Sequence, residues 1–191
     1  FNDKEIDLEL ENYTNKILEK YKKKRYLSKN NNIFRKLNLI KKKFQKSFFL
    51  IPFRNPENQS YSLYKQHLNF IELHKRNKFS LKYMNDLGHF EFGKNHKPWF
   101  QPINFKDALD INYWLEQWFL YYSYIHENYA FKKNFLFMSY EKFCDDLRYR
   151  KKLSNKLNID KNVVFNLKNK NKNDVKIRFD NTLIKKCNQL H

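Results

Sequence analysis

The chain has 191 residues, with 39 lysines and arginines against 20 aspartates and glutamates, which gives a formal net charge of +19. This length allows a domain with a substantial core, and a hydrophobic content of 41% excludes a chain that is disordered throughout. No apolar run approaches the roughly 20 residues of a membrane-spanning helix, so we expect no membrane span. We expect residues 1–191 to form a single domain.

The net charge has two interpretations. A basic chain can bind a polyanion such as a nucleic acid. Alternatively, the abundance of Lys, Asn, Ile, Phe and Tyr, with only 2 Gly and 4 Pro, is what an AT-rich gene encodes. We favour the second interpretation because the lysines are spread along the chain, although a basic surface still attracts an anionic substrate. Cys144 and Cys187 form no CxxC pair, which favours a reducing compartment, the cytoplasm.

The first third of the chain predicts a βαβ unit after an N-terminal helix. Apolar residues at helical spacing predict helices over 2–23 and 33–44. The segment 25–29 between them is a strand candidate, and the apolar run 48–53 has the length of a fully buried strand. Strand, helix and strand with short links predict a right-handed parallel unit.

The remaining elements extend this pattern. We predict helices over 57–74, 77–87, 105–129, 142–156 and 181–190, and a buried strand over 135–139. Both glycines and all four prolines lie between Pro52 and Pro102, so the irregular loops belong there. The predicted fold class is α/β, with helices on both faces of a parallel sheet in three layers.

Each of the three predicted strands is followed or ended by a polar residue: Lys29, Arg54 and Tyr140. The carboxyl ends of parallel strands share one edge of a sheet, where ligands bind. Arg54 stands in a turn before Pro56 and a helix start that carries Ser60 and Ser62. A helix N-terminus and an arginine together suit an anion.

These segments resemble a known family. The stretch Phe49 to Ser62 is similar to the 3′-phosphate-binding strand–turn–helix of sulfotransferases that use 3′-phosphoadenylyl sulfate (PAPS), in which a serine stands eight positions after an arginine. Tyr26 to Lys29 resembles the upstream strand that ends in lysine, and Met138 to Cys144 resembles the downstream Tyr-Glu element. The segment 83–93 resembles a loop of bacterial members.

The resemblance implies a function and a site. Arg54 and Ser62 would hold the 3′-phosphate of PAPS, Tyr140 would lie near the adenine, and Lys29 would neutralise charge near the sulfuryl group. The reaction would transfer this group to a hydroxyl or amine of a small-molecule, carbohydrate or peptide acceptor. No metal is implied, because lysine and arginine can neutralise the charge.

One part of the family pattern is missing. The family's phosphate loop is rich in Gly or Ser and precedes the Lys29 element, whereas the first glycine here is Gly88. We therefore expect an N-terminally incomplete, P-loop-like sulfotransferase domain, a C-terminal fragment with low or no activity. The alternative is a non-catalytic basic module that binds nucleotides or nucleic acid.

The loop histidines have three interpretations. His89, Glu91 and His96 could contact the acceptor, with His89 as the candidate general base; they could be hydrogen-bonded within the loop; or they could bind a metal. Their spacing is not typical of a zinc site, so we expect no metal. His67 and His74 are predicted to be surface or helix-packing residues.

Overall fold

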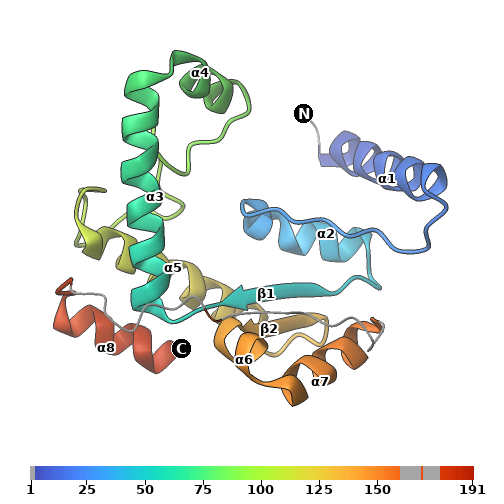
Figure 1. The fold of residues 1–191 in the computed structure, drawn as a ribbon. Helices are drawn as coiled ribbons and strands as arrows, with labels where there is room; N and C mark the ends of the chain where they lie inside the picture. The colour runs from blue at the N-terminus through green and yellow to red at the C-terminus, as the bar shows by residue number, and fades with distance from the viewer. Residues whose placement is uncertain (1–2, 160–168, 170–176) are drawn as a thin grey trace. The chain divides into compact units, whose positions relative to one another are not determined.

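The computed structural model describes residues 3–159, 169 and 177–191, and the chain forms two compact units, residues 1–47 and 48–191 (Figure 1).

The first unit is helical. It contains α1 (Asp3–Lys20), a 3₁₀ helix η1 (Ile33–Lys36) and α2 (Leu37–Lys43). An ion pair of 2.5 Å between Lys43 Nζ and Glu11 Oε2 links α2 to α1. α1 ends before Lys22, whose φ of 50° is left-handed. Both helices predicted in this part of the chain are confirmed, the second with a 3₁₀ first turn.

The strand predicted over 25–29 is wrong. These residues have no regular secondary structure, and Leu27 is 93% exposed. A strand is stabilised by hydrogen bonds to a neighbour and by apolar side chains that it buries, and this segment has only Tyr26 and Leu27 to bury. The predicted βαβ unit is therefore not formed.

The second unit contains a two-stranded parallel sheet. β1 (Phe49–Phe53) pairs with β2 (Phe135–Ser139), and the register places Phe53 opposite Ser139. Parallel strands need a long crossover, which here consists of α3 (Pro56–Arg76), α4 (Lys78–Asp86) and α5 (Ile111–Tyr129). The α/β class with parallel strands is confirmed, but the described residues form two strands and not three, and most of the structure is helical.

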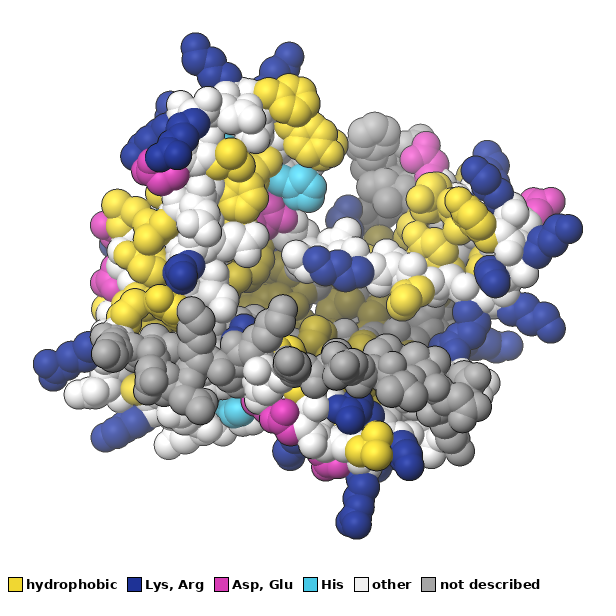
Figure 2. All heavy atoms as spheres, viewed as in Figure 1, with side chains coloured by type: hydrophobic (Ala, Val, Ile, Leu, Met, Phe, Trp, Pro, Cys, Tyr) yellow, Lys and Arg dark blue, Asp and Glu magenta, His cyan; other side chains and the backbone are white. Residues whose placement is uncertain are grey.

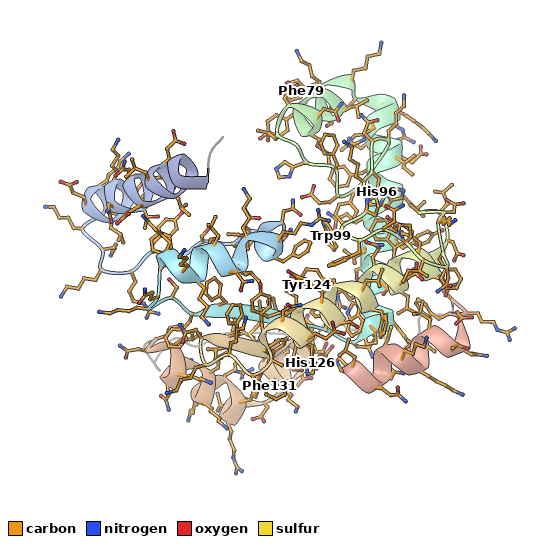
Figure 3. The ribbon with its side chains drawn as sticks, turned by 180° about the vertical axis from the view of Figure 1, so that it is seen from behind. Phe79, His96, Trp99, Tyr124, His126 and Phe131 are labelled. Atoms are coloured by element: carbon orange, nitrogen blue, oxygen red, sulfur yellow. The ribbon has the colours of Figure 1, made fainter. Side chains whose placement is uncertain are left out.

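The core of the second unit is built around α5, which packs against α3 and α8 (Asn181–Leu190). Large side chains of α5 are buried: Tyr113, Trp114, Leu115, Trp118, Ile125 and Tyr129. Rings from the preceding loop and from α5 add to this packing, with centroids 5.9 Å apart for Trp99 and Tyr121 and 5.6 Å apart for Phe100 and Tyr124 (Figure 3). No helix among the described residues is both long and apolar enough to cross a membrane.

Two predicted helices differ from the structure. α5 begins at Ile111 and not near Phe105, because Asp110 caps it by accepting a hydrogen bond from the Asn112 N–H. The helix predicted over 142–156 is two helices, α6 (Tyr140–Asp145) and α7 (Leu147–Leu157). Asp146 separates them, since its carboxylate accepts from the backbone N–H groups of Arg148 and Tyr149.

Candidate anion-binding site

The turn after β1 is shaped by the sequence Arg54-Asn55-Pro56. The Asn55 side chain caps α3 by accepting from the Asn58 N–H at 3.0 Å. Pro56 occupies the first helical position, where its fixed φ suits a helix and its missing N–H costs nothing. The helix therefore starts sharply, with Arg54 directly before it.

Three predicted site residues meet at this turn. Arg54 Nη1 donates to Ser62 Oγ at 3.3 Å, and the Arg54 guanidinium carbon lies 5.1 Å from the centroid of the Tyr140 ring. Tyr140 reaches Arg54 because Phe53 and Ser139 are paired at the ends of the two parallel strands, so the next residue of each chain segment lies at the same edge.

The two serines of α3 differ in position. Ser62 is exposed, and its hydroxyl accepts from Arg54 and donates to the Asn58 carbonyl at 2.8 Å. Ser60 is fully buried, and its hydroxyl has no hydrogen-bond partner in the described structure. Only Ser62 can therefore reach a ligand beside Arg54, and it would do so by turning its hydroxyl hydrogen away from Asn58.

Glu141 ties the two strand ends together. Its Oε1 accepts from the Asn55 N–H at 2.8 Å, and its Oε2 accepts from the Ser139 hydroxyl at 3.2 Å. His191 Nε2 lies 4.0 Å from the same carboxylate. The Tyr-Glu pair thus has two parts: Tyr140 faces the arginine, and Glu141 holds the backbone of the turn.

A small pocket of about 380 Å³ adjoins Arg54 and Ser62, and we call it the Arg54 pocket. Its other lining residues lie at helical spacing on α3 and include Tyr61, Lys65 and Asn69. Lys65 was missed by the sequence reasoning, although its place three residues after Ser62 puts it on the same helix face. Arg54 and Lys65 give this pocket two cations.

Lys29 belongs to the first unit, where it lies exposed in the segment without regular structure. The geometry of the Arg54 pocket concerns the second unit alone, so the predicted role of Lys29 stays a prediction.

The predicted base His89 has an exposed position. Its Nδ1 lies 3.3 Å from Glu91 Oε1, and it lines neither of the two hollows described for the second unit. His96 lies instead beside Tyr113, with Nε2 2.6 Å from the phenol oxygen and Nδ1 3.2 Å from the Phe90 carbonyl. A carbonyl only accepts, so the neutral ring carries its hydrogen on Nδ1 and accepts the Tyr113 hydroxyl at Nε2.

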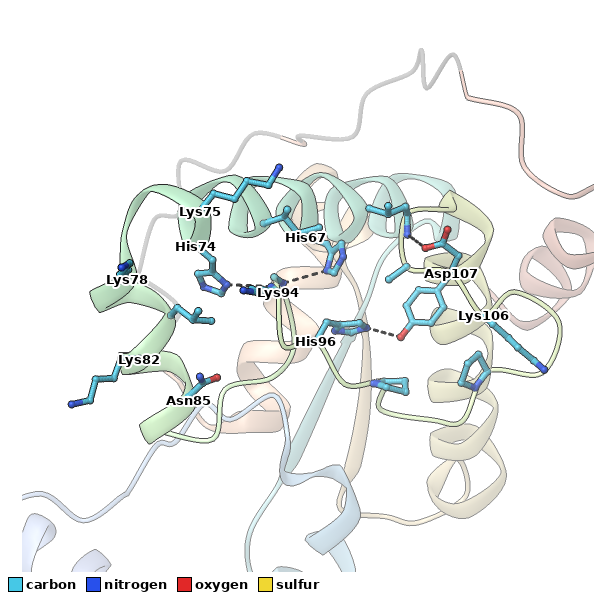
Figure 4. A pocket seen from close by; sticks show the side chains of 18 of the residues that line it. His67, His74, Lys75, Lys78, Lys82, Asn85, Lys94, His96, Lys106 and Asp107 are labelled. Carbon is cyan, nitrogen blue, oxygen red and sulfur yellow. Dashed lines mark hydrogen bonds between the residues drawn. The ribbon is translucent and has the colours of Figure 1, made fainter.

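His67 and His74 are buried on α3, and both hold the following loop. The Gly93 N–H donates to His67 Nδ1 at 3.3 Å, and the Lys94 N–H donates to His74 Nδ1 at 3.2 Å (Figure 4). Burial lowers the pKa of His67 to about 4, assisted by the nearby His96 and opposed by Asp107. Burial also lowers the pKa values of His74 and His96. A neutral ring leaves Nδ1 of His67 and of His74 able to accept these hydrogen bonds.

These histidines line a larger hollow of about 1290 Å³ between the C-terminal half of α3, α4 and the loop 93–109. We call it the histidine hollow. In the described residues no group of three or more His, Cys, Asp or Glu side chains has a metal-binding arrangement.

Comparisons of the chain with protein-family models, with curated proteins and with solved structures each gave no match. The sulfotransferase resemblance therefore rests on the residues quoted from the sequence.

Proposed function

We propose that the second unit binds the 3′-phosphate of an adenosine nucleotide in the Arg54 pocket and that the protein is a sulfotransferase that uses PAPS. The observation that carries the proposal is the meeting of Arg54, Ser62 and Tyr140 at one sheet edge, from segments far apart in the chain. The finer fold that goes with it is the three-layer, P-loop-like sulfotransferase domain.

The pocket has the chemistry of a phosphate monoester site. Arg54 offers a planar set of N–H donors, Lys65 offers a second positive charge, and Ser62 offers a hydroxyl. A monoester carries close to two negative charges at neutral pH, so two cations match it better than one. Tyr140, already against the Arg54 guanidinium, supplies an aromatic surface for the base.

In the proposed reaction the acceptor oxygen or nitrogen forms a bond to sulfur while the bond from sulfur to the bridging phosphate oxygen breaks. The acceptor proton passes to a base, for which His89 is the sequence-based candidate. The nucleotide leaves as adenosine 3′,5′-bisphosphate. Lys29 is the candidate for neutralising the charge that develops on the bridging oxygen. For these 191 residues we propose nucleotide binding with low or no turnover.

The test is a titration of the protein with adenosine 3′,5′-bisphosphate, followed by calorimetry and thermal shift. We expect binding, and we expect Arg54→Ala to weaken it by roughly 10- to 100-fold, because a hydrogen bond to a charged group contributes about 1.5–3 kcal/mol. Arg76→Ala is the matched control, since Arg76 lies at the other end of α3 and is 83% exposed.

Adenosine 5′-monophosphate and single-stranded RNA separate this proposal from its alternative. A 3′-phosphate site binds the bisphosphate far better than the monophosphate. Equal affinity for both nucleotides, or tighter binding of RNA that falls steeply with salt and is indifferent to Arg54→Ala, would identify a general polyanion binder and reject the proposal.

A further inference from the structure

The histidine hollow is separate from the Arg54 pocket. The two share no lining residue, and each lies wholly within the second unit. Nothing in the proposed donor chemistry uses the larger hollow. Its volume of about 1290 Å³ exceeds the roughly 300–1,000 Å³ of an ordinary small-ligand site, so it has room for a ligand of several linked units.

The walls of this hollow are held in place from two helices. On one side, His67 and His74 of α3 accept the N–H groups of Gly93 and Lys94. On the other side, Tyr113 of α5 donates to His96. Fixed walls matter because a ligand then binds without first ordering the loop.

Lysines surround the hollow. Five line it, Lys75, Lys78, Lys82, Lys94 and Lys106, against two carboxylates, Asp86 and Asp107. Lys75 is paired with Glu72 at 2.6 Å, whereas the other four form no ion pair within the described parts of the chain. The hollow therefore has an excess of positive charge, which attracts anionic ligands.

The lysines are spread along the hollow. Figure 4 shows Lys78 and Lys82 of α4 at one end, Lys94 between His74 and His67 in the middle, and Lys106 together with Asp107 at the other end. Because His67 accepts at Nδ1, its hydrogen is on Nε2, which adds a neutral hydrogen-bond donor to the middle of the hollow beside the positive charge of Lys94. Asn85 and Gln101 add amide groups to the same lining.

We propose that the histidine hollow binds a short, elongated anion that carries negative groups along its length. Carboxylate and phosphate groups share the chemistry that lysine recognises, so acidic oligosaccharides and oligophosphates are the two sources to compare. Binding here is independent of the Arg54 pocket.

The probes are trigalacturonate and inorganic tripolyphosphate, titrated calorimetrically into the full chain at 0.15 M salt. Trigalacturonate carries a carboxylate and hydroxyls on every sugar, whereas tripolyphosphate carries charged phosphates alone, so the tighter of the two identifies the source. Neutral maltotriose tests the need for charge, and the single units, galacturonic acid and inorganic phosphate, test the need for length. We expect the preferred trimer to bind at least tenfold more tightly than maltotriose and than its own single unit.

Figure 2 shows lysines and arginines scattered over the face of the molecule in view. The experiment must therefore distinguish binding of the anion in the hollow from its general attraction to a basic surface. Lys82→Ala/Lys106→Ala removes one cation from each end, and we expect roughly a tenfold loss of affinity, as for two partly exposed ion pairs. Lys151→Ala/Lys152→Ala makes the same charge change on α7, outside the hollow, and should leave the affinity within twofold.

Prior saturation with adenosine 3′,5′-bisphosphate should not change the affinity of the preferred probe, and the probe experiment stands even if the bisphosphate fails to bind. The inference is overturned if neither probe binds, if the two double variants lose affinity equally, or if the single unit of the preferred probe binds as tightly as its trimer.

Discussion

At Gly93 the absence of a side chain allows the loop to pack closely against the ring of His74. The φ of Gly93 is +85°, in the left-handed region, and a Cβ at this position would overlap with the ring of His74. Gly88 also has a positive φ, of 68°, but a Cβ there would meet no atom within 4 Å. A side chain at Gly88 would therefore add backbone strain alone, whereas a side chain at Gly93 would add both strain and steric overlap.

Gly93→Ala is therefore expected to lower the free energy of unfolding by about 2–4 kcal/mol, from strain and overlap together. Gly88→Ala should cost only the strain, about 1–2 kcal/mol. Urea denaturation of both variants measures the difference. Equal losses would mean that the His74 ring moves aside at no cost.

The residues of the Arg54 pocket show what a sequence pattern can reveal at this scale. The sequence placed both Ser60 and Ser62 on the helix that follows Arg54, and the family resemblance chose Ser62, which the structure brings within hydrogen-bonding distance of Arg54. The loop contacts of His67 and His74 were missed, because nothing local indicates which loop docks on a helix face.

Among the elements, α5 organises the loop before it through its buried polar residues. Glu116 is 2% exposed, and its carboxylate accepts from the N–H groups of Ile103 and Asn104 at 2.9 and 3.0 Å. Gln117 accepts from the Phe100 N–H and donates to the Phe100 carbonyl. The segment 100–105 is therefore held against α5 by side chains of the helix.

Glu116→Gln should destabilise the protein by roughly 1–3 kcal/mol, because an amide nitrogen replaces one accepting oxygen and leaves a buried N–H without a partner. The measurements are urea denaturation and the rate of limited proteolysis near residues 100–105. Glu127→Gln, on the exposed end of the same helix, is the control and should change neither. Similar proteolysis of the two variants would contradict the role of Glu116.

The elements also show where local patterns are sufficient. The two apolar runs that became β1 and β2, and the amphipathic segments of α3 and α8, fold as their own periodicity predicts. The start of α5 and the break at Asp146 depend on capping side chains, which hydrophobic spacing does not reveal. Aspartate is nevertheless a preferred N-cap residue, so Asp110 and Asp146 carried a local signal for these two helix starts.

At the scale of the whole molecule, stability should depend on pH through the buried histidines. The pKa of His67 is lowered from 6.5 to about 4, so between these values the unfolded chain binds more protons than the folded one. The contribution of neutral His67 to the free energy of unfolding is therefore fully present above pH 6.5 and is lost as the pH falls towards 4. The shift bounds this contribution at roughly 3 kcal/mol.

Thermal denaturation from pH 7.5 to 4.5 tests this dependence. His67→Gln should flatten the decline, because a glutamine oxygen can accept from the Gly93 N–H without titrating. Asn69→Gln, a change at an exposed, non-titrating position of the same helix, is the control and should keep the wild-type slope. If His67→Gln declined as steeply as the wild-type protein, the dependence would arise elsewhere, for example at the carboxylates.

The division of the chain into two units was not indicated by composition, because lysine, asparagine and aromatic residues occur on both sides of Ser47. The prediction of a third strand, over residues 25–29, was wrong for a related reason. A segment with two apolar residues can be matched to a family pattern, but its folding as a strand depends on a neighbour that the local sequence does not specify.

The hydrogen bond between the Asn55 N–H and Glu141 spans 86 positions of the chain. The turn that carries Arg54 is therefore completed by a residue that is synthesised long after it. A peptide covering residues 48–66 contains both Arg54 and Ser62 but neither Tyr140 nor Glu141, so it lacks the aromatic ring beside the guanidinium and the carboxylate that holds the turn. These two contacts depend on the pairing of strands that lie far apart in the chain, and such pairing carries a large loop-closure entropy.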